Sequence, residues 1–225
     1  MTRFWALLTA ITGIASLGTV ATFQMLGEVK AAQACNAGEA VIRFELARSI
    51  DTLLAIFGPV ESACRGKIIA AVDAVNTLDI HAFIPSYTAF AVFAALFLSV
   101  GRLVPLALAA IVAALVACAA DYVETLSLLA YTPDLSPSTE ALATSANAAW
   151  IKFAALGLNG LCLAGLCFTS EARRPILGVL LCLPAIGVAM MAVDLKWIWL
   201  QSLGFFASWT PLLLMALRAA VLGRE

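Results

Sequence analysis

Long apolar runs separated by short polar connections dominate the pattern along this chain. Six runs contain no charged residue, and each has close to the ~20 residues that a bilayer-spanning helix needs. They cover residues 4–27, 82–101, 103–120, 153–170, 175–193 and 197–217. Backbone polar groups in lipid must be satisfied within the fold, and the alternating pattern of a membrane β-barrel is absent from the sequence. The pattern therefore predicts an all-α fold, a bundle of six transmembrane helices.

One longer connection, residues 28–81, has apolar positions that recur every three or four residues, as in amphipathic helices. In its first part these positions are Ile42, Leu46, Ile50, Leu53 and Phe57, and in its second part Cys64, Ile68, Val72, Val75 and Leu78. Gly58 and Pro59, between the two parts, suit a helix end and a helix start. We therefore predict an external helical hairpin at 28–81, inserted into a single integral membrane domain, residues 1–225. Such a small hairpin needs the membrane, the bundle or another protein as a support.

The amino-acid composition indicates which class of protein this is. Hydrophobic residues make up 63% of the 225 residues and charged residues 12%, and the mean hydropathy is +1.01. One soluble core of this size cannot bury so much apolar surface, so the sequence indicates an integral membrane protein. The net charge of −1 and the lack of a basic patch exclude nucleic acid as a partner. Membrane lipids are the expected partners.

The first apolar run has an alternative interpretation as a cleaved signal peptide, because Arg3 precedes it and small residues follow at 31–34. The run covers 24 residues (4–27), whereas a signal peptide core usually has about 7–15. We expect a retained first helix.

Basic residues in the short connections indicate the orientation. On one side of an alternating six-helix path lie Arg3, Arg102, Arg173, Arg174, Arg218 and Arg224. The segment 28–81, on the other side, has five basic residues and seven acidic ones. Because cytoplasmic loops hold an excess of Lys and Arg, we expect a multi-pass inner (plasma) membrane protein with both termini cytoplasmic.

The six cysteines give no clear disulfide or metal pattern. Four lie in apolar runs, where cysteine is usually a packing residue. Cys35 and Cys64 share the predicted external hairpin, but a continuous first arm of ~27 Å would carry Cys64 to the far tip, beyond the reach of a short coil. We expect these two cysteines to be unbridged, with a bridge as the alternative. A single histidine, His81, and scattered thiols do not suit zinc, so we predict no metal and no cofactor.

Charged residues near one end of the predicted spans are the candidates for a functional site. If the third helix continues beyond residue 120, Asp121 and Glu124 lie on one face, three residues apart. The small residues Ala109, Ala113 and Ala117 extend that face, and small residues let membrane helices approach closely. The two carboxylates are therefore expected to face protein.

Lys152, at a matching depth on the next helix, is the predicted partner of Glu124 in an ion pair. The predicted polar cluster comprises Asp79, His81, Tyr87, Asp121, Glu124, Lys152, Asn159 and Asp194. Two interpretations stay open: the ion pair fixes helix register, or an acid in excess over base serves as a proton relay, a general acid or base, or a cation site.

The run Asp121-Tyr122-Val123-Glu124-Thr125 carries a resemblance, with Asp79 and Ile-Pro-Ser-Tyr (84–87) before it and Trp-Ile-Lys (150–152) after it. Over about residues 79–153 the chain resembles an uncharacterised group of bacterial multi-pass membrane proteins, which has an Asp-x-x-Glu-Asn-like motif and a following Lys. Thr125 stands where that group usually has Asn. The resemblance implies that these residues act as one unit, and it implies no activity.

We favour a non-catalytic protein that binds a lipid or an apolar small molecule, or that serves in complex assembly through the hairpin. The alternatives are a membrane acid/base enzyme on a lipid-like substrate and a proton- or cation-coupled transporter. The sequence lacks a nucleophile-and-base motif and a phosphate-binding loop, which disfavours the enzyme. It also lacks an internal repeat, and only possible helix breaks near Pro184 and Pro211 favour the transporter.

Overall fold

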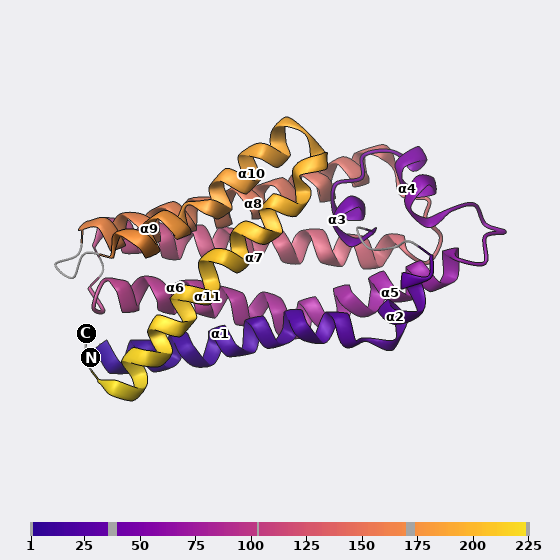
Figure 1. The fold of residues 1–225 in the computed structure, drawn as a ribbon. Coiled ribbons are helices and arrows are strands. Elements are labelled where there is room, and N and C mark those ends of the chain that lie inside the picture. The colour runs from indigo at the N-terminus through magenta and orange to yellow at the C-terminus, as the bar shows by residue number, and fades with distance from the viewer. Residues whose placement is uncertain (1, 36–39, 103, 170–173, 224–225) are drawn as a thin grey trace. The chain divides into compact units, whose positions relative to one another are not determined.

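The computed structural model describes residues 2–35, 40–102, 104–169 and 174–223, and these residues form helices without any strand (Figure 1). Six helical stretches of the described residues are long and apolar enough to cross a membrane. They are Arg3–Met25, Arg65–Leu98, Pro105–Tyr131, Thr139–Thr169, Pro175–Val193 and Leu195–Leu222. The predicted all-α fold with six spans is confirmed, and the chain is a multi-pass membrane protein. Arg173 and Arg224, used above for orientation, lie outside the described residues.

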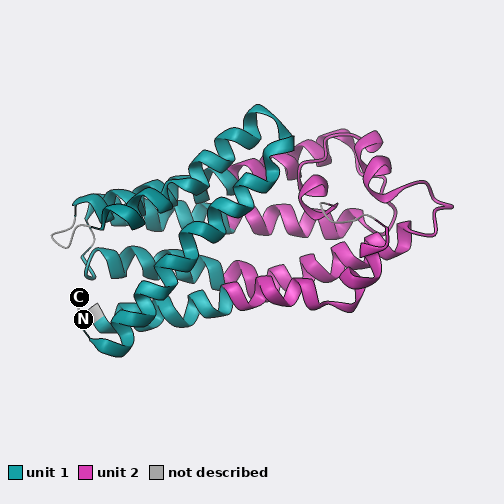
Figure 2. Ribbon diagram, viewed as in Figure 1, with its two compact units in different colours: residues 1–16, 86–118, 152–225 teal, residues 17–85, 119–151 magenta. Residues whose placement is uncertain are grey.

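The chain divides into two compact units (Figure 2). Unit 1 comprises residues 1–16, 86–118 and 152–225, and unit 2 comprises residues 17–85 and 119–151. Helices α1 (Thr2–Met25), α6 (Ile84–Leu98), α7 (Pro105–Tyr131) and α8 (Thr139–Thr169) contribute residues to both units. A single domain over residues 1–225 stays a prediction.

In unit 1 the two ends of the chain are joined by Arg3 at the start of α1. Its guanidinium donates to the carbonyl oxygens of Ala220 (2.9 Å) and Val221 (3.2 Å), in the last turn of α11 (Ile198–Leu222). A cation at a helix C-terminus satisfies free carbonyls and complements the helix dipole. Gly223, with φ +62°, then ends the helix in the left-handed conformation that glycine adopts without strain.

The fifth span is broken at Cys182 into α9 (Pro175–Leu181) and α10 (Leu183–Val193), as expected for a break near Pro184. Two glycines pack against this break. A Cβ atom on Gly160 of α8 would lie 2.6 Å from the Leu181 carbonyl oxygen, and one on Gly204 of α11 would lie 2.8 Å from that of Leu183. The break is therefore a site of close backbone packing between helices.

The expectation of a second break, near Pro211, is wrong. Helix α11 stays helical through this proline. Membrane helices tolerate an interior proline where neighbouring groups satisfy the freed backbone.

Unit 2 differs from the predicted two-armed hairpin. The predicted first arm is not one helix, because α3 (Ala40–Glu45) ends before Ser49, which caps α4 (Ile50–Phe57) by accepting a hydrogen bond from the Thr52 backbone N–H (3.2 Å). The predicted second arm, α5 (Arg65–Leu78), continues through a π-helical turn, Asp79–Phe83, into α6 (Ile84–Leu98). It is the first part of the second span, Arg65–Leu98. A protein partner on segment 28–81 stays a prediction.

Helices α3, α4 and α5 contribute to a hydrophobic core of unit 2, and α2 (Gly27–Gln33) packs against α5. The core contains Ala40, Phe44, Ala47, Leu53, Phe57, Ile68, Val72, Leu128, Leu135 and Leu142. The rings of Phe44 and Phe57 meet edge to face, with centroids 5.0 Å apart. The core therefore joins α3, α4 and α5 to the ends of α7 and α8 that belong to this unit.

Cys35 and Cys64 form a disulfide, with Cα atoms 5.7 Å apart, so the expectation that they are unbridged is wrong. That expectation assumed a straight first arm. The break before α4 removes that arm, and Arg65 closes the next turn by donating to the Gly58 carbonyl oxygen (3.0 Å). Cys64 thereby returns to the end of α2, where Cys35 lies.

Candidate functional site

The first polar site lies in unit 2, where the π-helical turn meets α7. The Thr125 hydroxyl oxygen lies 3.4 Å from Asp79 Oδ2 and 3.4 Å from Asp121 Oδ1. One hydroxyl therefore links two carboxyl groups that belong to separate helical segments. Tyr122 adds a second link one residue away, since its hydroxyl donates to the Ile80 carbonyl oxygen (3.2 Å). Single π-turns inside α-helices are frequent at functional sites.

This polar site is deeply buried. Asp121, Glu124 and Thr125 expose 2%, 1% and 1% of their surface, and Asp79 is half-buried. Burying polar side chains costs free energy unless polar neighbours form hydrogen bonds with them. The contacts of Thr125 with the two carboxyl groups reduce that cost. Thr125, at the position where the resembled group usually has Asn, supplies the hydroxyl on which the two carboxyl groups converge.

Two more polar residues of α5 lie beside this site, and the sequence analysis missed them. Asn76 is 2% exposed, and its Nδ2 atom has no hydrogen-bond partner among the described residues. The Oδ1 atom of Asp73, one turn earlier, is also buried and has no partner within the described part of the chain. The three-residue spacing of Asp73, Asn76 and Asp79 is the signal that could have revealed them.

The remaining predicted site residues of α6 and α8 have local partners in unit 1. The ring of Tyr87 packs against Trp209, with centroids 6.2 Å apart. Lys152 is 6% exposed, and its Nζ lies 4.7 Å from the centroid of the Phe153 ring. Asn159 donates through Nδ2 to the Ala110 carbonyl oxygen (2.8 Å), which joins α8 to α7. Lys152 and Glu124 belong to different units, and their ion pair stays a prediction.

Asp194 and His81 have exposed positions. Asp194 caps the 3₁₀ turn Leu195–Trp197 and pairs with Lys196 Nζ at 2.7 Å, with side chains 43% and 66% exposed. The hydrogen bonds from Lys196 lower the pKa of Asp194. An exposed pair of this kind contributes little to stability. His81 is exposed in the π-helical turn of unit 2. Membership of Asp194 and His81 in the polar cluster stays a prediction.

The described residues contain no group of three or more His, Cys, Asp or Glu side chains arranged to hold a metal ion.

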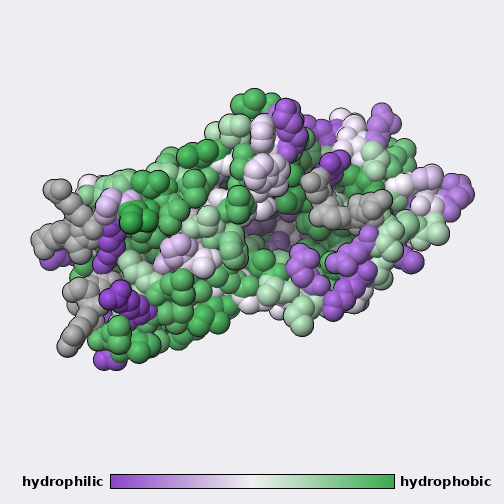
Figure 3. Space-filling view, in the orientation of Figure 1, coloured by the Kyte–Doolittle hydropathy of each residue, from purple (hydrophilic) through white to green (hydrophobic). Residues whose placement is uncertain are grey.

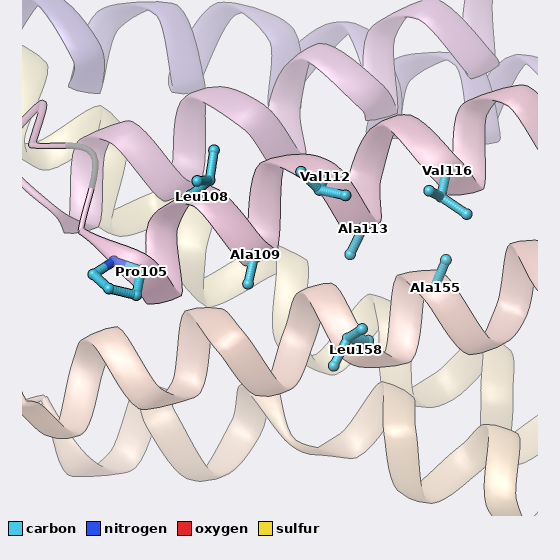
Figure 4. A pocket seen from close by; sticks show the side chains of 8 residues that line it. All are labelled: Pro105, Leu108, Ala109, Val112, Ala113, Val116, Ala155 and Leu158. Atoms are coloured by element: carbon cyan, nitrogen blue, oxygen red, sulfur yellow. The ribbon is translucent and has the colours of Figure 1, made fainter.

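A second candidate site is an apolar groove in unit 1, between α7 and α8 (Figure 4). It is lined by Pro105, Leu108, Ala109, Val112, Ala113, Val116, Ala155 and Leu158 and has a volume of about 450 Å³. Small-molecule sites commonly span ~300–1,000 Å³. Figure 4 shows Ala109 and Ala113 pointing from α7 toward α8, with Ala155 and Leu158 pointing back.

The groove corrects one prediction about α7. Ala113 and Ala117 are buried, as expected for a seam of small residues, but Ala109 is exposed and lines the groove. A short side chain there leaves a hollow between larger neighbours. Leu108 and Val112 on the rim are about half exposed, at 50% and 51%.

No protein-family model, curated protein or solved structure matches the chain. The resemblance to a group of bacterial membrane proteins stays a prediction. A functional assignment therefore depends on the geometry and chemistry of the two candidate sites.

Proposed function

We propose that the protein is a non-catalytic membrane protein that binds a lipid acyl chain, or a similarly apolar small molecule, in the groove between α7 and α8. The groove itself carries this proposal. Its eight lining residues are all apolar, and it lies on helices apolar enough to span a bilayer, where acyl chains surround the protein. The alanines provide depth, and the exposed leucines and valines provide the walls.

Filling the groove tests the proposal. Ala109→Leu adds a branched side chain inside the hollow, so we expect less lipid to be retained when the detergent-extracted protein is weighed by native mass spectrometry. Ala154→Leu is the matched control, because Ala154 is exposed on α8 and does not line the groove. Equal lipid retention in the two variants would rule out the groove as the binding site.

We also propose that the protein resides in the inner membrane with both termini cytoplasmic. Two observations support this orientation. Arg3, Arg102, Arg174 and Arg218 lie in or beside short connections on one side of the alternating path. The disulfide Cys35–Cys64 lies in the long segment on the other side, and disulfides persist in oxidising compartments outside the cytoplasm.

Thiol labelling of intact cells tests this orientation. After mild reduction, a membrane-impermeant maleimide should label Cys35 and Cys64. The double variant Cys35→Ser with Cys64→Ser is the control for labelling elsewhere. Labelling that requires cell lysis would place this segment in the cytoplasm instead.

The two alternative functions have weaker support. Breaks near Pro184 and Pro211 were the features that favoured a transporter; helix α11 continues through Pro211, and at the break between α9 and α10 Gly160 and Gly204 pack against the backbone. For an acid/base enzyme, Asp79 and Asp121 supply carboxyl groups, and their described contacts are with the Thr125 hydroxyl of the fold itself.

A further inference from the structure

An unsatisfied donor and an unsatisfied acceptor lie one turn apart on α5. Asn76 Nδ2 can only donate a hydrogen bond and the Oδ1 oxygen of Asp73 can accept one, and both atoms are buried without a partner among the described residues. Buried polar atoms are nearly always hydrogen-bonded, to protein, water or a ligand. This pair therefore indicates a group that belongs beside α5.

The contacts of α5 show which way Asn76 faces. Val72, four residues before Asn76, belongs to the same core cluster as Leu128 of α7. Asp79, three residues after Asn76, contacts Thr125 of α7. Positions three or four apart share a helix face, so Asn76 lies between these two contacts and points toward α7. Its 2% exposure agrees with that position.

The missing group must both accept and donate a hydrogen bond over a short span. Side chains three residues apart on a helix have Cβ atoms about 5–6 Å apart, and one oxygen with hydrogen bonds of about 2.7–3.0 Å can bridge them. A hydroxyl meets both needs, since its oxygen accepts from Asn76 Nδ2 while its proton is donated to Asp73 Oδ1. A phosphate dianion cannot donate to Asp73 and is repelled by it, and a quaternary ammonium group has no proton to donate.

We infer that Asp73 and Asn76 form a binding site for an uncharged hydroxyl group of a small molecule. The site lies at the beginning of the second span, Arg65–Leu98. A hydroxyl there comes either from the headgroup of a neutral lipid, such as a diacylglycerol, or from a soluble polyol. This inference concerns unit 2 and does not depend on the groove of unit 1.

Thermal unfolding of the full chain in phosphatidylcholine nanodiscs tests this site. Dioleoylglycerol in the nanodiscs should raise Tm, by about 2–4 °C when it is present at about five times its Kd. The methyl ether of the same lipid has no proton to donate, so it should give no rise. Glycerol in the buffer is the second arm: a rise with glycerol assigns the hydroxyl to a soluble polyol, and a rise with dioleoylglycerol alone assigns it to a lipid.

Variants of α5 separate specific binding from general effects of these additives. Asn76→Leu removes an unsatisfied buried amide, so it should raise the Tm of the protein without ligand and abolish the response to either hydroxyl probe. Thr77→Val is the matched control, because Thr77 is the exposed neighbour on the same helix, and it should keep the response.

Two results would overturn the inference: no response to either hydroxyl probe, as expected if only water fills the site, or an unchanged response in Asn76→Leu. The two proposals fail separately. Acyl-chain retention in Ala109→Leu tests the groove, and the response to one hydroxyl in Asn76→Leu tests the site on α5.

Discussion

Units 1 and 2 are held together in different ways. In unit 1, glycines bring helix backbones into contact, as at Gly160 and Gly204, and alanines line the helix faces. In unit 2, short helices enclose an aromatic core and a disulfide. On the face shown in Figure 3, hydrophobic side chains cover most of unit 1, whereas hydrophilic ones gather over α2–α5.

This difference follows from the surroundings that each construction suits. Lipid gives no hydrophobic driving force between helices, so close van der Waals packing of small residues must hold them. An enclosed core with a covalent link is typical of small domains that face water. Substitutions that act on a core, a crosslink or a backbone contact should therefore affect one unit more than the other.

The largest expected effect is in the unit 2 core. Phe57 is fully buried against Phe44, so Phe57→Ala should lower the free energy of unfolding by about 3–5 kcal/mol through lost burial and a cavity. Hydrogen exchange should increase mainly in α3, α4 and α5. An equal increase throughout unit 1 would contradict two separately stabilised units.

Reduction of the disulfide should have the next largest effect. Cys35 and Cys64 are 29 residues apart in sequence, and losing a native disulfide from a small domain costs about 2–5 kcal/mol. Thermal unfolding followed by hydrogen exchange, with and without reductant, measures this loss. The variant Cys182→Ser is the control, because Cys182 is a free thiol in unit 1. Exchange in α2 and α5 that is insensitive to reductant would show that the crosslink does not stabilise unit 2.

In unit 1 the corresponding test is an added methyl group. Gly160→Ala would place a Cβ atom 2.6 Å from the Leu181 carbonyl oxygen, so we expect overpacking to cost about 1–3 kcal/mol in detergent. Gly18→Ala is the matched control, since a Cβ atom there has no atom within 4 Å. Equal Tm values for the two variants would mean that α8 does not contact the break as closely as described.

The sequence was sufficient for features that depend on local composition. Apolar runs of the right length predicted the six spans, and the periodic small residues of α7 predicted that Asp121 would be buried. It was insufficient where a local signal competed with the periodic one. The apolar stripe from Ile42 to Phe57 predicted one helix, whereas the cap at Ser49 starts a new helix within it.

Contacts between residues far apart in the sequence were also not predicted. The disulfide depends on how the chain turns between α2 and α5, and a spacing of 29 residues alone does not reveal that path. The π-helical turn at Asp79 likewise has no sequence signature in a single chain. The three-residue spacing of Asp73, Asn76 and Asp79 marked a polar face of α5 in the sequence, but the unsatisfied amide of Asn76 is visible only in atomic positions.

The smallest expected effect tests the polar contact of unit 2. Thr125→Val keeps the shape of the side chain and removes the hydroxyl that links Asp79 and Asp121. Because both oxygen–oxygen distances are long, at 3.4 Å, we expect a loss of only about 0.5–1.5 kcal/mol, measured by thermal unfolding in detergent. Ser127→Ala is the control, because the Ser127 hydroxyl bonds only the Val123 carbonyl oxygen of its own helix (2.6 Å) among the described contacts. If Thr125→Val costs no more than the control, the Thr125 hydroxyl does not contribute to holding the π-helical turn against α7.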